Sequence, residues 1–203
     1  MKELTINEFN SALASSAPVP GGGGVSALVG ALGAGLGVMV GALTIGKKKY
    51  AETESEMREI TSEAKEIQSR LLELIDEDAK VFEPLSRAYS LPKDAPDRDK
   101  VMEKCLALAA SAPTEIAELS CRVIELAERF ARIGSALAIS DAGCAAELCR
   151  ASLKSAALNV YVNTRLMKNR AAAEEMNGKI RVMLEKYVPQ ADRIYDFVAE
   201  KIM

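Results

Sequence analysis

The fold is decided by residues 17–50, which read APVPGGGGVSALVGALGAGLGVMVGALTIGKKKY. Proline and glycine dominate the first eight positions, so this part predicts a non-helical lead-in. From Val25 to Gly46 no residue is charged, which favours a helix that is buried on all sides inside a bundle. Gly33, Gly37 and Gly41 recur every four residues, so one face of this helix presents only small residues.

The same segment is long enough to cross a membrane, and Lys47, Lys48 and Lys49 follow it as cations follow a membrane helix. Against insertion, the segment is mostly Gly and Ala rather than Leu, Ile and Phe, and the rest of the chain is rich in charged amphipathic helices. Nothing at the N-terminus resembles a signal peptide. We therefore expect a soluble, cytoplasmic protein with no membrane partner.

Composition indicates one all-α domain over residues 1–203. Apolar residues make up 49% of the chain but aromatic residues only 4%, which suits a core of small aliphatic side chains between closely packed helices. Helical periodicity and breaks at Pro and Gly predict further helices over residues 8–14, 52–89, 98–110, 113–134, 142–168 and 174–202. In this scheme Pro113 is the first residue of its helix, Asp141 caps the helix from 142, and Pro189 kinks the last helix.

Several classes of function are disfavoured by the residue counts. Lys and Arg number 26 against 29 Asp and Glu, so no overall positive field attracts nucleic acid. The sequence has no His and no C-x-x-C pair among its four cysteines, which argues against a zinc site, and we expect no metal and no disulfide. Without His, acid and base chemistry must use Asp, Glu, Lys, Tyr or Cys.

A carboxylate lies in phase with the apolar stripe of the helix predicted over 52–89. Steps of three and four from Ile75 reach Asp78 and then Phe82, whereas Asp76 is about 200° around the helix on the solvent side. A buried carboxylate is costly unless it is paired, and such groups gather at functional sites. Asp78 is therefore either a functional acid or base, or the partner of a structural ion pair.

Two other features could bind an anion. Gly21, Gly22 and Gly23 precede a helix start, where free backbone N–H groups attract a carboxylate, a phosphate or a developing oxyanion, although no P-loop pattern is present. The alternative is a flexible lead-in. Lys47 and Lys48 either stabilise the negative end of the same helix or attract a ligand with several carboxylates.

Two amides share one face of the helix predicted over 142–168. Asn159 and Asn163 are spaced i, i+4 in a groove of small residues, where amides can hydrogen-bond a heterocycle. A buried Asn pair that bridges two helices is an equally ordinary explanation.

Taken in order, several blocks resemble the formimidoyltetrahydrofolate cyclodeaminase/methenyltetrahydrofolate cyclohydrolase family. The blocks are residues 17–24 (APVPGGGG), 43–50 (LTIGKKKY), 76–82 (DEDAKVF), 91–93 (LPK), 139–141 (ISD) and 157–163 (ALNVYVN). The resemblance covers nearly the whole chain, and the ordered set is more specific than any one block. Val19 departs from the Thr that is frequent in the family, so a hydroxyl role there is in doubt.

The resemblance implies an all-helical bundle with a buried glycine- and alanine-rich helix, a homodimer, and a tetrahydrofolate site near the glycines and Asp78. A free-standing chain with these blocks is most similar to the cyclohydrolase members, which open 5,10-methenyltetrahydrofolate to 10-formyltetrahydrofolate. The alternative within the family is formimidoyltetrahydrofolate cyclodeaminase, which releases ammonia. An alternative of another class is a non-enzymatic dimeric binding or scaffold protein.

These expectations assign a role to each candidate residue. Asp78 is the base or proton shuttle, and the backbone at Gly21, Gly22 and Gly23 holds the ligand or a developing negative oxygen. Lys47 and Lys48 steer the glutamate tail, and the pterin is placed by three polar residues, namely Asp141, Asn159 and Asn163. No cofactor beyond the folate substrate is expected.

Overall fold

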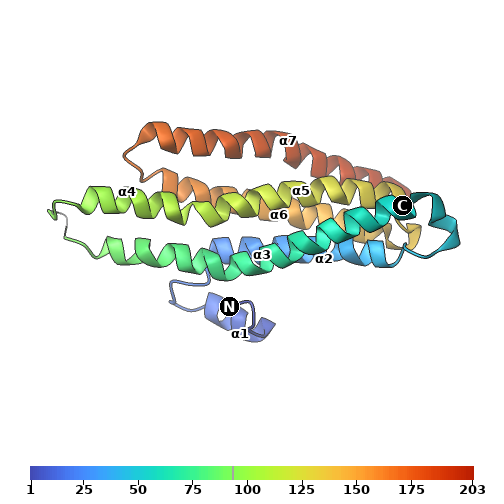
Figure 1. Cartoon of the computed structure of the whole chain (residues 1–203), viewed down its shortest axis with the longest axis horizontal. Coiled ribbons are helices and arrows are strands. Elements are labelled where there is room, and N and C mark those ends of the chain that lie inside the picture. Colours follow the sequence, from blue (N-terminus) through green and yellow to red (C-terminus); the bar gives the residue numbers. More distant parts are fainter. Residues whose placement is uncertain (93) are drawn as a thin grey trace.

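A computed structural model describes residues 1–92 and 94–203, and all regular secondary structure in these ranges is helical, as predicted (Figure 1). Lys93, the last residue of the LPK block, lies outside the described residues. The helices are α1 Ile6–Leu13, α2 Gly22–Ala42, α3 Glu54–Tyr89, α4 Arg98–Ala109, α5 Ser111–Ile133, α6 Ile139–Thr164 and α7 Arg170–Ile202, with short 3-10 helices η1 Lys48–Thr53 and η2 Ala136–Ala138.

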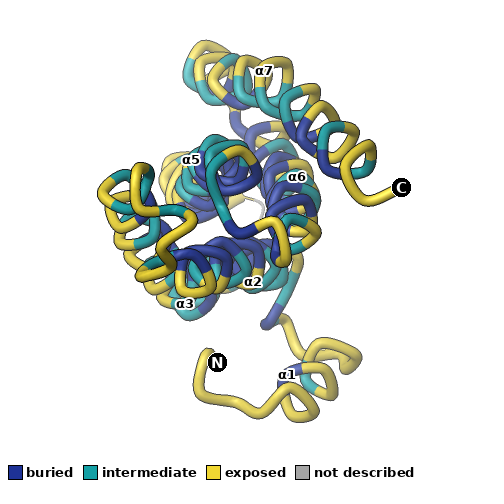
Figure 2. Tube along the Cα trace, turned by 90° about the vertical axis from the view of Figure 1, so that its right-hand side faces the viewer, coloured by how far each residue is buried: buried dark blue, intermediate teal, exposed yellow. Residues whose placement is uncertain are grey.

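The helices α2, α3, α5 and α6 form the central bundle, and α7 packs on α5 and α6. In Figure 1, α4 continues the line of α5 along the length of the bundle. The short helix α1 stands apart below the bundle in both Figure 1 and Figure 2. Phe9 is its one residue in the buried class, so most of α1 contacts solvent.

The charge-free segment is a helix, but it is shorter and less buried than predicted. α2 ends at Ala42 rather than at Gly46, so the three lysines lie beyond the helix and do not cap it. The prediction that it is buried on all sides is wrong, because Leu32, Met39 and Leu43 are 55%, 39% and 43% exposed. By length and composition alone α2 could cross a membrane, and half of its apolar window is buried inside the bundle.

The glycines of α2 let three neighbouring helices approach its backbone. A Cβ atom on Gly33 would lie 2.6 Å from Cys149 Sγ of α6, and one on Gly37 would lie 2.7 Å from Phe130 Cε2 of α5. A Cβ atom on Gly41 would overlap the Thr61 side chain of α3. The glycine repeat therefore serves packing within the bundle at all three positions.

Pro113 and Asp141 do not have the positions at helix starts that the sequence predicts. Pro113 is the third residue of α5, not the first, and the break between α4 and α5 falls one turn earlier, where the proline ring would clash with the carbonyl of Ala109. Asp141 does not cap α6, because η2 runs directly into it and Ala138 is the N-cap residue. Asp141 instead lies in the first turn of α6.

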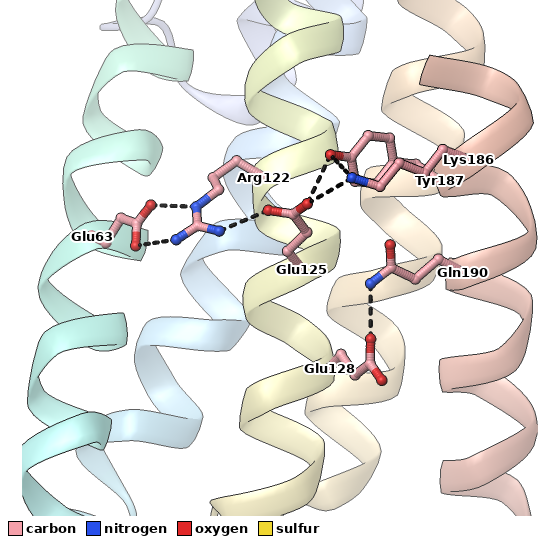
Figure 3. A network of polar contacts seen from close by, with 7 residues as sticks. All are labelled: Glu63, Arg122, Glu125, Glu128, Lys186, Tyr187 and Gln190. Carbon is pink, nitrogen blue, oxygen red and sulfur yellow. Dashed lines mark hydrogen bonds and ion pairs between the residues drawn. The ribbon is translucent and has the colours of Figure 1, made fainter. Parts of the chain in front are cut away.

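Polar side chains connect α3, α5 and α7 on one side of the bundle (Figure 3). Arg122 of α5 donates to Glu63 of α3 at 2.9 Å. Glu125, one turn along α5, accepts a 2.7 Å hydrogen bond from the Tyr187 hydroxyl of α7. These exposed or half-exposed pairs link the three helices, and each adds little to stability.

We predict that Gly33→Ala lowers the free energy of unfolding by about 1–3 kcal/mol, because the new methyl group overpacks the contact with Cys149 and the Ala145 carbonyl. The matched control is Gly178→Ala in α7, where the nearest atom to a new Cβ is the Arg181 side chain at 3.9 Å. That variant should gain up to about 1 kcal/mol from helix propensity. Chemical denaturation measures both, and equal stabilities would contradict the close-packing role of Gly33.

Candidate functional site

A cleft with about 600 Å³ of open space lies beside the N-terminal end of α2, and residues of α3, α4, α5 and α6 form its other walls. The residues that line it come from the lead-in and from α2 to α6, and they are Pro18, Val19, Gly21, Gly22, Gly23, Asp78, Phe82, Ala109, Pro113, Asn159, Val162 and Asn163. Six of the nine residues predicted for the site are therefore neighbours.

The Asp78 carboxylate lies directly against the backbone of Gly23. A Cβ atom on Gly23 would overlap both carboxylate oxygens of Asp78, so only glycine fits there. The Asp78 carboxylate therefore occupies the space over the first turn of α2. The glycine run predicts that an anionic ligand binds in this space. The carboxylate of the protein itself, rather than a ligand, is the first group to face these backbone amides.

Burial raises the pKa of Asp78, and a hydrogen bond from the Gly24 backbone acts in the opposite direction. No Lys or Arg in the described part of the chain pairs with Asp78 or lowers its pKa, so the ion-pair explanation is not supported there. By contrast, Asp76 pairs with the Met1 amino group and Glu77 pairs with Arg70. A carboxyl group with a raised pKa and no cation is suited to exchange protons with a ligand.

The two predicted amides lie on the opposite wall. A Cβ atom on Gly22 would be 2.9 Å from Asn159 Nδ2, so the absence of a side chain at Gly22 leaves room for this amide. Gly23 leaves room for the Asp78 carboxylate in the same way. Asn159 Nδ2 donates to the Ser155 carbonyl and Asn163 Nδ2 to the Asn159 carbonyl, both at 2.8 Å. Each amide keeps a second N–H and its Oδ1 for a ligand.

Sequence reasoning missed the apolar part of the cleft. Phe82 lies one turn after Asp78 on the same face of α3, and Ala109, Pro113 and Val162 complete the wall. The i, i+4 spacing of Asp78 and Phe82 could have identified the aromatic residue. Together these side chains can hold one flat ring beside a carboxylate and two amides.

Lys47, Lys48 and Asp141 lie at the opposite end of the bundle in a single subunit. They follow the C-terminal end of α2 or start α6, and α2 alone is about 30 Å long. Asp141 and Asn159 are 18 residues apart on α6, which separates them by about 27 Å. One chain therefore cannot place all nine predicted residues around one small molecule.

The described residues contain no cluster of three or more Cys, Asp or Glu side chains that could hold a metal ion. Three of the cysteines are buried and Cys144 is exposed, and all four are free thiols. Burial raises the pKa of Cys121 to about 12, which keeps this thiol protonated near neutral pH.

Comparison with known proteins identifies several relatives. Residues 5–182 match the model of a family described as formiminotransferase-cyclodeaminase. A methenyltetrahydrofolate cyclohydrolase of Methylorubrum extorquens is 40% identical, with 98% of this chain and 97% of that protein covered. A formimidoyltransferase-cyclodeaminase of Mus musculus is 28% identical over 93% of this chain, which spans 36% of the mouse protein. The crystal structure of a formiminotetrahydrofolate cyclodeaminase from Thermotoga maritima superposes with a TM-score of 0.84 at 28% identity, covering 99% and 96% of the two chains.

We predict that Gly23→Ala displaces the Asp78 carboxylate toward solvent, so that its pKa falls to the ordinary range of an exposed aspartate. Gly21→Ala is the control, because a Cβ atom there meets nothing within 4 Å and its φ of −123° suits alanine. Carboxyl titration by NMR measures both variants. A raised pKa that persists in Gly23→Ala would show that Gly23 does not position Asp78.

Proposed function

Because the chain belongs to the formiminotransferase-cyclodeaminase family, we propose that it hydrolyses 5,10-methenyltetrahydrofolate to 10-formyltetrahydrofolate. It is an enzyme of folate one-carbon metabolism. The 40% identical cyclohydrolase, matched along almost its whole length, favours hydrolysis over the other activity of the family. In this proposal a single cyclodeaminase/cyclohydrolase domain spans residues 1–203.

The observation that carries the proposal is the cleft with Asp78 on one wall and Asn159 on the other. A pterin ring carries paired hydrogen-bond donors and acceptors, which Asn159 and Asn163 can match. Phe82 offers an apolar face for a flat ring. Among the described residues that line the cleft, Asp78 is the one with an ionisable side chain, and no cation in that part of the chain pairs with it.

The reaction needs a base and a proton carrier. Water attacks the bridge carbon between N5 and N10 while its proton passes to the Asp78 carboxylate, which gives a neutral carbinolamine. The bond from this carbon to N5 then breaks as N5 takes a proton from Asp78 and the hydroxyl group loses its proton to solvent. The products are the 10-formyl group and one released proton, so no redox equivalent is consumed, and we propose that no cofactor beyond the folate is needed.

Other residues position the substrate in this proposal. The backbone at Gly21 and Gly22 borders the bridge region, and the glycines permit close approach of the ligand. Lys47 and Lys48 attract the glutamate tail and Asp141 contributes to pterin placement. Because these three residues are distant from the cleft in one subunit, their roles require a second subunit.

The second candidate activity is formimidoyltetrahydrofolate cyclodeamination. The similarity to the Thermotoga maritima cyclodeaminase favours it, because that likeness covers almost all of both chains. The same carbon becomes tetrahedral in both reactions, but its substituents differ. In deamination N10 attacks the formimidoyl carbon on N5 and loses its proton, so the tetrahedral carbon carries an amino group in place of the hydroxyl group. The bond to this amino group then breaks as the nitrogen takes a proton and leaves as ammonia. Asp78 would then donate a proton to the leaving nitrogen.

We further propose a homodimer that acts in the cytoplasm, without nucleic acid or membrane as partner. A non-enzymatic scaffold protein is the alternative of another class, and it predicts no turnover of either folate. Incubation of the purified chain with methenyl- and formiminotetrahydrofolate in separate assays distinguishes the three functions. Loss of methenyl absorbance supports hydrolysis, ammonia release supports deamination, and no turnover of either compound would exclude both enzymes.

We predict that Asp78→Asn lowers turnover by about 10² or more, because the amide keeps the shape of the carboxylate but cannot accept the proton. Folate binding should persist. Asp76→Asn is the control, since this acid pairs with the Met1 amino group outside the cleft and should affect turnover far less. Steady-state kinetics, folate affinity and melting temperature are measured for both, and near-normal turnover of Asp78→Asn would refute its role as base.

A further inference from the structure

The buried apolar residues form two separate cores, and the cleft lies between them. The larger core belongs to the central bundle. The smaller core joins the end of α3, α4 and the turn from α6 to α7. Its buried residues are Leu85, Ala88, Cys105, Leu106, Ala109, Met167 and Ala173. Small-molecule sites often lie where separately packed units meet.

Asp78 and Asn163 mark this boundary on two walls of the cleft. On α3, Asp78 comes after Ile75 of the larger core and before Leu85 of the smaller core. On α6, Asn163 likewise follows Val160 of the larger core and precedes the turn that belongs to the smaller core. A ligand that fills the cleft therefore contacts both packed units.

The smaller core lies in a projecting part of the molecule. The end of α3 and the whole of α4 extend past the N-terminal end of α2 (Figure 1). We call their residues 84–92 and 94–109 the α3/α4 tip. α4 packs mainly on α3 and has smaller contacts with α5 and α6, so most of the packing of α4 is within the tip itself.

Two interrupted helices join the tip to the bundle. Pro84 lies inside α3, where it has no N–H group for the helical hydrogen bond. Ala110 separates α4 from α5, and Pro113 in the first turn of α5 also lacks this donor. Phe82 and Pro113 line the same cleft, so both interruptions lie close to its level. Bending at these two points would move the tip as a unit.

Glu103 of α4 holds the other side of the tip. Its two carboxylate oxygens accept hydrogen bonds from the backbone N–H groups of Lys168 and Asn169 in the α6–α7 turn, at 2.7 and 3.1 Å. The Lys168 side chain also pairs with Asp99 of α4. All three contacts are exposed to solvent, where water competes for each partner. They can therefore break at a low cost in free energy.

The turn that donates these hydrogen bonds is itself fixed to the bundle. Arg170 donates to the carbonyl oxygens of Thr164 and Met167, at 2.8 and 3.0 Å. The Thr164 hydroxyl donates to Asn177 Oδ1 at 2.7 Å, which joins α6 to α7. When the contacts to Glu103 break, the turn keeps its place and the tip is the part that moves.

We propose that the α3/α4 tip is a movable wall of the cleft, which opens to let the folate enter and leave and which Glu103 holds closed. Opening separates α4 from α6 beyond Ala109 and widens the cleft toward the α6–α7 turn. Glu103 is a positioning residue, because it holds this wall and is not among the described residues that line the cleft. The inference rests on the proposed function for the identity of the ligand.

Hydrogen exchange of the ligand-free chain tests the movement without any activity. Amides of α4 should exchange through opening of the tip, and therefore faster than amides of α2, which require unfolding of the bundle. Glu103→Gln leaves one oxygen acceptor in place of two and should speed α4 exchange about tenfold. Pro84→Ala restores a helical hydrogen bond where the tip bends and should slow it.

The matched control is Glu175→Gln. Glu175 is an exposed acid that pairs with Lys179 of its own helix, 3.1 Å away, and this pair does not connect α4 to the turn. The substitution removes the same charge as Glu103→Gln and should leave α4 exchange unchanged.

Binding kinetics test whether the movement controls access to the cleft. Rapid mixing with 5-formyltetrahydrofolate, a stable folate, gives the association and dissociation rate constants. Glu103→Gln should raise both about tenfold and leave Kd within about twofold, because ligand entry and exit pass through the same open state. Pro84→Ala should lower both. Damage to the fold alone would reduce the fraction of chains that bind and would leave the two rate constants unchanged.

Three results would overturn the movable wall. They are equal exchange of α4 and α2 in the wild-type chain, exchange that neither Glu103→Gln nor Pro84→Ala alters, and a loss of affinity in Glu103→Gln without faster association. A wild-type chain that does not hydrolyse methenyltetrahydrofolate would instead refute the proposed function, and the exchange measurements would still show whether the tip opens.

Discussion

The close approach of other helices to the backbone of α2 is the constraint on which the rest of the structure depends. At Gly33, Gly37 and Gly41 a side chain would collide with α6, α5 and α3 in turn, so α2 can sit among all three only without Cβ atoms. The same property continues into the first turn. Gly22 and Gly23 leave the space that Asn159 and Asp78 occupy, and bundle packing and cleft geometry thus have one physical cause.

Much of this could be predicted from the sequence because it depends on local periodicity. The phase of Ile75 and Asp78 on one long helix correctly places the carboxylate toward the interior and separates it from Asp76. The capping box at Thr5 and Glu8 also forms as local rules require. The glycine run lines the cleft, but its backbone faces Asp78, and local sequence patterns do not encode this tertiary contact.

The positions of three other predicted residues could not be derived from the sequence for a different reason. Lys47, Lys48 and Asp141 belong to the same ordered set of family blocks as the cleft residues, but block order says nothing about distance in space. The two ends of a straight helix of 21 residues lie about 30 Å apart. The exposed residues Leu32, Met39 and Leu43 differ from the prediction for a related reason, because the hydropathy of a segment does not say which of its faces contacts other helices.

The central claim is that a half-buried Asp78, free of a cation partner in the described residues, exchanges the proton during methenyltetrahydrofolate hydrolysis. The pH dependence of kcat/KM, after subtraction of uncatalysed hydrolysis, tests it most directly. Because burial raises the pKa of Asp78, kcat/KM should fall as the pH drops through a value above the ordinary range of aspartate, and this ionisation should be absent from the residual rate of Asp78→Asn. The same acidic limb in wild type and Asp78→Asn would contradict the account.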